Sequence, residues 1–284
     1  MIPERDATLI SSTQNPKVKR LLLLQQKSSE RRQTGRFVVE GRRELQHCID
    51  AGYEVEEMFC LAPASSADAV ADTCAKGGTS AESGTFRFPV ESTIHRYCVT
   101  PQVYERMAYR GGTEGVIAIV KARTQTLADL HLPDNPLLVV LESVEKPGNL
   151  GAILRSADAA GADAVIVCDP LTDLYNPNLI RSSIGALFTM PTVACTSEAC
   201  IRFLKARDIQ ILTAQLQDSR LYYDTDMTRP TALVMGTEDT GLTPQWRQAA
   251  DAHIRIPMLG RLDSLNVSVS TAILLFEAVR QRQV

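Results

Sequence analysis

Polar or glycine-containing loops follow three strand-like segments in the second half of the sequence. They are KPGNLG (146–151) after 137–144, GTEDTGL (236–242) after 231–235, and LGRLDSLNVS (259–268) after 253–258. In open α/β sheets, ligands bind at the carboxyl ends of the strands. We therefore expect the three loops to share one site.

The loop sequences alone leave two interpretations open. Neither G-x-G-x-x-G nor G-x-x-x-x-G-K-[ST] occurs, so the ordinary dinucleotide and P-loop signatures are absent. The two glycines of GTEDTG, five residues apart, fit a nucleotide-like ligand, but glycines so placed are also common in a plain turn.

Each candidate residue in these loops also has a purely structural interpretation. Gly236 ends a strand, where either a turn or the close approach of a ligand to the backbone favours glycine. Asn149 and Asn266 precede helical patterns and suit helix N-caps. Glu238 could equally be a solvent-exposed acidic residue of a loop, and Ser264 an ordinary loop serine.

The elements that must position these loops alternate between strands and helices from Leu137 onward. LLVVLESV (137–144) is a continuous apolar run, typical of a strand buried in a parallel sheet. We predict further strands at 164–169, 210–216, 231–236 and 253–258, and helices at 150–162, 197–206 and 244–250. This alternation predicts a parallel sheet with right-handed crossovers.

The C-terminal stretch 264–282 combines two patterns. From Ala272 it is typical of an amphipathic helix, whereas small polar and apolar residues alternate over 264–270 and do not fit one.

The first 122 residues predict a smaller α/β unit. Its expected helices are 17–33, 42–52, 66–76 and 91–97, and its expected strands are 37–41, 56–62, 85–90 and 115–122. The stretch TQTLADLHLPDNP, with two prolines, is the best linker candidate. We expect domains at 1–122 and 137–284, joined by a linker at 123–136.

Basic residues are concentrated near the N-terminus. Between Lys17 and Arg43, nine basic residues face two acidic ones, a local charge of +7, so the rest of the chain sums to −10 within the net charge of −3. This asymmetry fits a polyanionic partner, while a solvated helix face is the ordinary alternative.

The spacing of the cysteines, the histidines and the apolar residues argues against several classes of protein. The seven cysteines form no C-x-x-C pair and the four histidines have no ligand spacing with them, so we expect neither a disulfide framework nor a bound metal. No apolar run reaches the roughly 18–20 residues of a membrane span, and the N-terminus lacks the pattern of a secretory signal. We expect a cytoplasmic protein that does not act at a membrane.

Three segments resemble, in order, the motifs of the SpoU, or TrmH-like, RNA ribose 2′-O-methyltransferases: 149–167, 233–242 and 256–282. The stretch SSTQNPKVKRLLLLQQ…TGRFVVEGRRELQHCIDAG also resembles the RNA-substrate domain of many members. The resemblance implies an α/β fold with a deep trefoil knot, in which 264–270 packs. It further implies S-adenosylmethionine as cofactor and a homodimer through the C-terminal domain.

The implied reaction is methyl transfer to a ribose 2′-hydroxyl, with large-subunit ribosomal RNA as the expected substrate. A tRNA 2′-O-methyltransferase, or a non-catalytic RNA-binding or ribosome-assembly protein on the same fold, are the alternatives. A generic α/β nucleotide-binding enzyme that acts on small molecules is disfavoured by the basic N-terminal segment.

The resemblance also assigns residues. Its catalytic set is Asn149, Arg155, Glu238, Ser264 and Asn266. Its cofactor set is Gly236, Ile256, Met258, Gly260, Leu265 and Asn266. The RNA-binding candidates are Lys17, Lys19, Arg20, Arg31, Arg32, Arg36, Arg42 and Arg43. Arg155, otherwise a surface salt-bridge residue, is expected to position the ribose–phosphate and stabilise the developing alkoxide, because its pKa is too high for a base. The proton acceptor is left open.

One position departs from the family pattern. The second motif usually reads G-x-E-G-x-G, and here Asp239 replaces the middle glycine. Asp tolerates a positive φ better than most residues, so we expect activity to persist. If a ligand approaches closely here, the carboxylate would weaken its binding or alter the choice of RNA.

Overall fold

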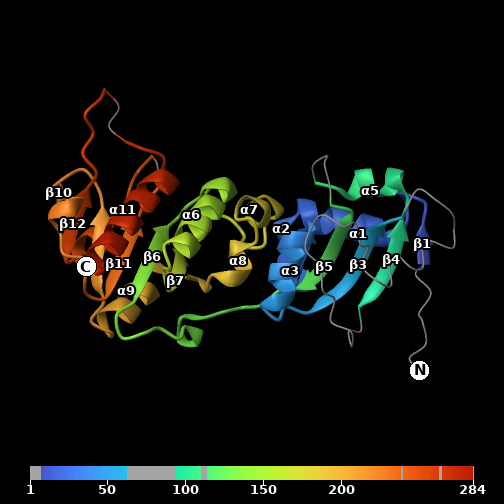
Figure 1. Cartoon of the computed structure of the whole chain (residues 1–284), viewed down its shortest axis with the longest axis horizontal. Helices are drawn as coiled ribbons and strands as arrows, with labels where there is room; N and C mark the ends of the chain where they lie inside the picture. Colours follow the sequence, from blue (N-terminus) through green and yellow to red (C-terminus); the bar gives the residue numbers. More distant parts are fainter. Residues whose placement is uncertain (1–7, 63–93, 110–113, 238, 262–263, 284) are drawn as a thin grey trace. The chain divides into compact units, whose positions relative to one another are not determined.

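The structure is a computed structural model that describes residues 8–62, 94–109, 114–237, 239–261 and 264–283 (Figure 1). The chain divides into two compact units. One comprises Met1–Arg123 with Tyr175–Arg181, and the other comprises Thr124–Leu174 with Ser182–Val284. A short segment inside the expected second domain is therefore grouped with the N-terminal unit, and most of helix α7 (Pro177–Ser182) belongs to it.

The N-terminal unit is built on a mixed sheet of strand order β1-β4-β3-β5-β2. Strands β1, β4 and β3 run parallel, and β5 pairs antiparallel with both β3 and β2. In chain order its described elements are β1 (Thr8–Ile10), α1 (Pro16–Gln26), α2 (Ser28–Thr34), β2 (Arg36–Glu40), α3 (Arg42–Asp50), β3 (Val55–Leu61), β4 (His95–Val99), α5 (Pro101–Met107) and β5 (Val116–Lys121).

Several sequence expectations for this unit need correction. The helix expected over 17–33 is two helices, because Lys27 adopts an extended conformation between α1 and α2. Residues 95–97, expected to end a helix, begin β4, which pairs with β3. Cys98 is disulfide-bonded, which its spacing did not predict. The elements expected at 66–76 and 85–90 lie outside the described residues.

The second unit is built on a sheet of strand order β10-β12-β9-β11-β6-β7-β8, in which every described pair is parallel. Its described elements are η1 (Leu127–Asp129), β6 (Leu137–Glu142), α6 (Pro147–Ala159), β7 (Ala164–Cys168), α8 (Ala186–Thr189), β8 (Thr192–Cys195), α9 (Ser197–Lys205), β9 (Gln210–Ala214), β10 (Arg220–Leu221), η2 (Tyr222–Asp224), β11 (Thr231–Met235), α10 (Pro244–Ala249), β12 (Ala252–Arg255) and α11 (Val267–Arg282).

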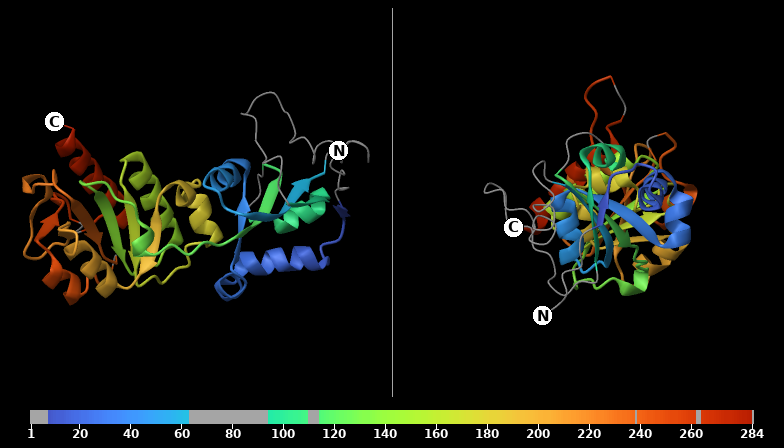
Figure 2. Two further views of the ribbon diagram at one scale, coloured as in Figure 1. Left: turned by 90° about the horizontal axis from the view of Figure 1, so that it is seen from below. Right: turned by 90° about the vertical axis from the view of Figure 1, so that its right-hand side faces the viewer.

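Helices cover both faces of this parallel sheet, as strands buried on both sides require. Helices α6 and α11 lie on one face, and α9 lies on the other (Figure 2, left). All six residues of β6 and all five of β7 and β11 are buried, in agreement with their apolar runs. On the α9 face the fully buried Trp246 of α10 packs with Phe203 and Leu204.

Helix α11 begins five residues earlier than the sequence pattern indicated. Asn266 is its N-cap, and the helix runs from Val267, so the alternating residues after Asn266 form its first turn. At the other end, Arg282 donates hydrogen bonds to the carbonyl oxygens of Met227 (2.9 Å), Pro136 (3.1 Å) and Arg229 (2.7 Å). Burial lowers the pKa of this guanidinium. These bonds hold the end of α11 against the segments that precede β6 and β11.

None of the helices in the described part of the chain has the length and apolar character needed to cross a membrane.

Candidate active site

Two asparagines far apart in sequence meet where α6 and α11 begin. Asn149 lies in the first turn of α6, which Pro147 opens. The side-chain amide of Asn266 donates to Oδ1 of Asn149 at 3.2 Å. Oδ1 of Asn266 accepts from the backbone N of Ser268 at 3.0 Å and from its hydroxyl at 2.6 Å. One amide group therefore caps α11 and joins it to α6. The cap of α6 itself is Lys146, so Asn149 is not the N-cap.

An apolar hollow lies beside this junction, at the carboxyl ends of β9, β11 and β12. It is lined by residues that include Gly236, Ile256, Met258, Ser264 and Leu265. Its cavity volume is about 140 Å³, and the hollow is open to solvent. Four of the six cofactor candidates and one catalytic candidate thus line a single hollow. Gly260 is exposed and does not line it.

A second, more polar hollow adjoins the first and shares Gly236, Thr237 and Val267 with it. Its other lining residues are Val144, Glu145, Lys146, Asn149, Asp239 and Thr240. The loops after β6, β11 and β12 therefore line two adjoining hollows at one edge of the sheet. The Asp239 carboxylate, in place of the family glycine, is at the polar hollow.

The loop after β11 is closed by its own hydrogen bonds. Thr237 N donates to Gly241 O and Gly241 N donates to Thr237 O, both at 3.2 Å. A Cβ on Gly236 would collide with the backbone of Gly241 and lie 2.6 Å from the N of Leu242. Close packing within the loop is thus a sufficient reason for glycine at 236, in addition to the expected approach of a cofactor.

Sequence reasoning missed a buried carboxylate that holds this loop in place. Glu142 ends β6 and is 2% exposed. It accepts hydrogen bonds from the backbone N of Thr243 at 2.8 Å and from its hydroxyl at 2.6 Å. Thr243 is the N-cap of α10 and follows the loop directly. A charged residue that ends an otherwise apolar strand was the available signal.

The remaining catalytic candidates differ in their surroundings. Arg155 is exposed on α6, and its guanidinium makes no hydrogen bond or ion pair with any residue that the structure describes. Ser264 is exposed at the rim of the apolar hollow. Glu238 lies outside the described residues.

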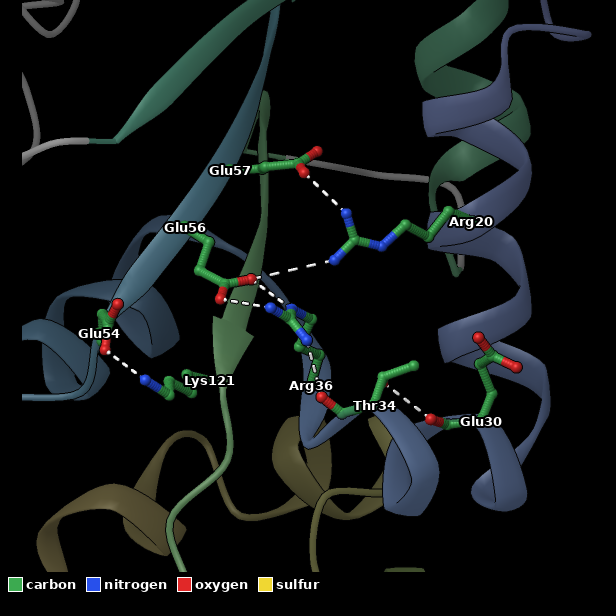
Figure 3. Close-up of polar contacts among 8 residues, drawn as sticks. All are labelled: Arg20, Glu30, Thr34, Arg36, Glu54, Glu56, Glu57 and Lys121. Atoms are coloured by element: carbon green, nitrogen blue, oxygen red, sulfur yellow. Dashed lines mark hydrogen bonds and ion pairs between the residues drawn. The ribbon is translucent and has the colours of Figure 1, made fainter.

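Acidic residues of β3 neutralise part of the N-terminal basic cluster (Figure 3). Arg36 binds Glu56 through two hydrogen bonds of 2.5 and 2.9 Å, and the Glu56 carboxylate raises the pKa of Arg36. Arg20 donates to Glu57 at 2.9 Å and lies 3.9 Å from Glu56. These two arginines therefore have structural partners.

The other basic candidates fall into three groups. Arg31 is 5% exposed and donates to the carbonyls of Leu24 and Gln25, so it caps the end of α1. Three candidates contact neighbours at the surface: Lys17 over the Tyr97 ring, Arg42 with the Glu114 carbonyl, and Arg43 with Glu44. Lys19 and Arg32 are exposed, and neither makes an ion pair with a described residue.

Comparison with known proteins decides the family. Residues 136–276 match the model of the SpoU rRNA Methylase family, and residues 15–118 match the MRM3-like substrate binding domain. A 23S rRNA (guanosine-2'-O-)-methyltransferase RlmB from Photobacterium profundum is 41% identical over 177 residues, which cover 60% of this chain and 72% of the relative. The chain belongs to the SpoU rRNA methylase family.

Solved structures extend the similarity over the whole chain. A crystal structure of an RNA 2'-O ribose methyltransferase has a TM-score of 0.79 at 34% identity, and covers 98% of this chain and 100% of its own. The AdoMet-bound rRNA methyltransferase from Sinorhizobium meliloti has a TM-score of 0.81 at 29% identity, with coverages of 96% and 98%. The family and the α/β fold class predicted from the sequence are confirmed.

Proposed function

We propose that this SpoU-family chain transfers a methyl group from S-adenosylmethionine to a ribose 2′-hydroxyl of large-subunit ribosomal RNA. The family match and the similarity to a 23S rRNA methyltransferase support the reaction and the class of substrate. The hydrogen bond between Asn149 and Asn266 carries the site assignment, because it joins the first and third family motifs beside two adjoining hollows.

The apolar hollow fits the adenosine part of the cofactor. Ile256, Met258 and Leu265 offer apolar contact, and the backbone that follows β11 and β12 offers hydrogen-bonding groups for an adenine edge. When bound, S-adenosylmethionine supplies a methyl group on a sulfonium, which is already a strong donor. The protein's task is then to align the 2′-hydroxyl with that methyl group.

The polar hollow and the exposed face of α6 suit the RNA. Asn149 lies in the hollow, and Arg155 stands six residues further along the same helix with its guanidinium exposed. We assign Arg155 to the ribose–phosphate and to the developing alkoxide. Glu238 and Ser264 keep their proposed supporting roles, and Gly260 and Asn266 border the cofactor.

In the N-terminal unit we propose that the accessible basic residues contact RNA phosphates. They are Lys17, Lys19, Arg20, Arg32, Arg36, Arg42 and Arg43. We leave out Arg31, because it is buried and donates to the carbonyls of Leu24 and Gln25 at the end of α1. The domain boundaries at 122 and 137, the trefoil knot and a cytoplasmic location stay predictions.

A homodimer through the C-terminal domain is part of the proposal. Val269 and Phe276 are 47% and 50% exposed, lie seven residues apart on α11 and therefore share one helix face. Leu265 just before the helix is 40% exposed. Such a stripe fits a self-complementary apolar contact between two copies.

Light scattering should give twice the chain mass for the wild type and the single mass for Phe276→Glu. An unchanged mass for the variant would place the contact elsewhere.

Mapping 2′-O-methyl groups in total RNA, from cells with and without the gene, tests the function itself. We expect one position of large-subunit ribosomal RNA to lose its methyl group. Loss from a tRNA would select that alternative instead. An unchanged map, together with no heat of S-adenosylmethionine binding in calorimetry, would identify a non-catalytic RNA-binding protein.

A further inference from the structure

Three cysteine thiols from three separate elements meet on one face of the parallel sheet. Cys168 ends β7, Cys195 ends β8, and Cys200 lies in the first half of α9. Their sulfur atoms all lie within 4.8 Å of one another. Cys168 and Cys200 are fully buried, whereas Cys195 is half-buried and gives the cluster an opening toward solvent.

Regular structure holds the three positions. Cys168 and Cys195 are direct partners in the parallel pairing of β7 and β8, and the N of Asp169 donates to the carbonyl of Cys195 at 2.8 Å. Thr196 caps α9 by accepting from the N of Ala199 at 3.2 Å, which places Cys200 one turn into the helix. No loop movement is needed to bring the sulfurs together.

We propose that Cys168, Cys195 and Cys200 form a binding site for one thiophilic divalent ion, zinc in the first instance. Zn–S bonds of about 2.3 Å at tetrahedral angles separate two sulfurs by about 3.8 Å. Sulfurs within 4.8 Å therefore reach this geometry by a contraction of about 1 Å or less, which small side-chain rotations supply. A water molecule on the half-buried side of Cys195 completes the coordination.

The surroundings favour a cation over a disulfide. A disulfide would bond two of the sulfurs and leave the third without a bond, whereas one metal ion can be coordinated by all three. The charged neighbours are carboxylates: Asp169 adjoins Cys168 in sequence, and Glu142 is the β6 residue paired with Cys168. The described core around the cluster is otherwise apolar, with Phe203, Leu204 and Trp246 among its members. Zinc binding would release the thiol protons, and the charge of the ion would compensate the thiolates formed in this core.

The proposed site also adjoins the network that supports the loop after β11. Ser197, between Cys195 and Cys200, donates to Asp169 at 2.6 Å and accepts from Nε1 of Trp246 at 2.9 Å. Its hydroxyl lies 3.4 Å from Glu142, which holds Thr243. A bound ion would tie β7, β8 and α9 together at this network.

Metal titration of the full chain tests the site independently of methylation. Reduced, metal-free protein is titrated with Zn²⁺ in competition with a chromophoric chelator, and with Co²⁺ to detect thiolate-to-metal charge-transfer absorption. We expect one ion per chain and a rise in the unfolding temperature with zinc. Cys195→Ser should lose affinity by at least the ten- to hundredfold typical of losing an outer-shell partner.

Cys60→Ser is the matched control, because Cys60 is also half-buried and free but belongs to the N-terminal unit. It should bind zinc like the wild type. Binding by Cys195→Ser equal to that of the wild type would overturn the proposal. So would no zinc uptake by wild-type protein with all three thiols reduced, or a disulfide between any two of them found by mass spectrometry in the protein as purified.

Discussion

At the scale of single residues, side chains of the candidate site either stabilise the fold and position the site, or remain available to a ligand. Asn266 accepts a hydrogen bond from the backbone N of Ser268 in the first turn of α11 and donates one to Asn149. The same amide therefore stabilises the fold and positions the site. Arg155 makes no bond that stabilises the described structure, so its guanidinium is available to a ligand. The position of their loops after parallel strands predicted that Asn149 and Asn266 belong to one site. Residue types and spacing could not predict the hydrogen bond between them, across 117 positions.

Arg155 provides the clearest test of a role confined to catalysis. Arg155→Ala should slow methylation by about 10²–10³-fold, typical of losing one preorganised donor to a developing oxyanion. Its affinity for S-adenosylmethionine in calorimetry should equal that of the wild type. Arg155→Lys should be intermediate, because lysine keeps the charge but not the planar fork. The control is Arg202→Ala, which removes an exposed arginine paired with Glu198 on α9. Normal methylation by Arg155→Ala would refute the assignment.

Substitutions of Asn266 separate its two contacts. Asn266→Asp keeps the acceptor for Ser268 but cannot donate to Asn149, so it should unfold at the wild-type urea concentration and methylate more slowly. Asn266→Ala removes the cap as well and should lower the free energy of unfolding by about 1 kcal/mol. Urea denaturation and a methylation assay on the same preparations distinguish the two effects. Full activity of Asn266→Asp would show that the bond to Asn149 is dispensable.

At the scale of elements, periodicity predicted the long buried strands. It failed to predict the ends of elements that are set by local contacts. The runs that became β6, β7 and β11 are uniformly apolar, so their burial could be predicted. Periodicity missed the early start of α11, which agrees instead with the N-cap interpretation of Asn266. Thr271 supports this first turn, because its hydroxyl donates to the carbonyl of Val267.

Other elements also depend on contacts that a sequence window does not contain. Neither glycine nor proline marks the break at Lys27; Arg31 from α2 donates to the buried carbonyls of Leu24 and Gln25 at the end of α1. β8 has only four residues, too few for a periodic signal, and is defined by its pairing with β7.

Glu142 links β6 to the start of α10, and its removal should destabilise the second unit. Glu142→Ala leaves the N and hydroxyl of Thr243 without their acceptor, so the free energy of unfolding should fall by about 2 kcal/mol. Glu142→Gln keeps one carbonyl oxygen and should lose less. Glu198→Ala is the control, because it breaks only an exposed pair worth about 0.5 kcal/mol or less. Equal urea midpoints for Glu142→Ala and Glu198→Ala would contradict this role.

At the scale of the whole molecule, the charge asymmetry of the sequence overstates the free positive charge. The local +7 counts only acids close in sequence. The fold brings β3 alongside, so that Glu56 and Glu57 pair with Arg20 and Arg36 (Figure 3). A linear count cannot include acids that arrive through strand pairing. The predicted RNA surface therefore depends most on the basic residues that the fold leaves unpaired.

RNA binding should accordingly be more sensitive to Lys19 and Arg32 than their share of the cluster suggests. Lys19→Ala and Arg32→Ala should each weaken RNA binding and reduce the slope of log affinity against log salt by about 1, because each removes one phosphate contact. Arg36→Ala should change the slope less but lower the unfolding temperature, since it leaves Glu56 without its two-bond partner. Filter binding of a ribosomal RNA fragment over a salt series measures the slopes.

The control is Lys205→Ala, which removes an exposed lysine on α9. A reduced slope for Lys205→Ala together with wild-type slopes for Lys19→Ala and Arg32→Ala would move the RNA surface to the second unit.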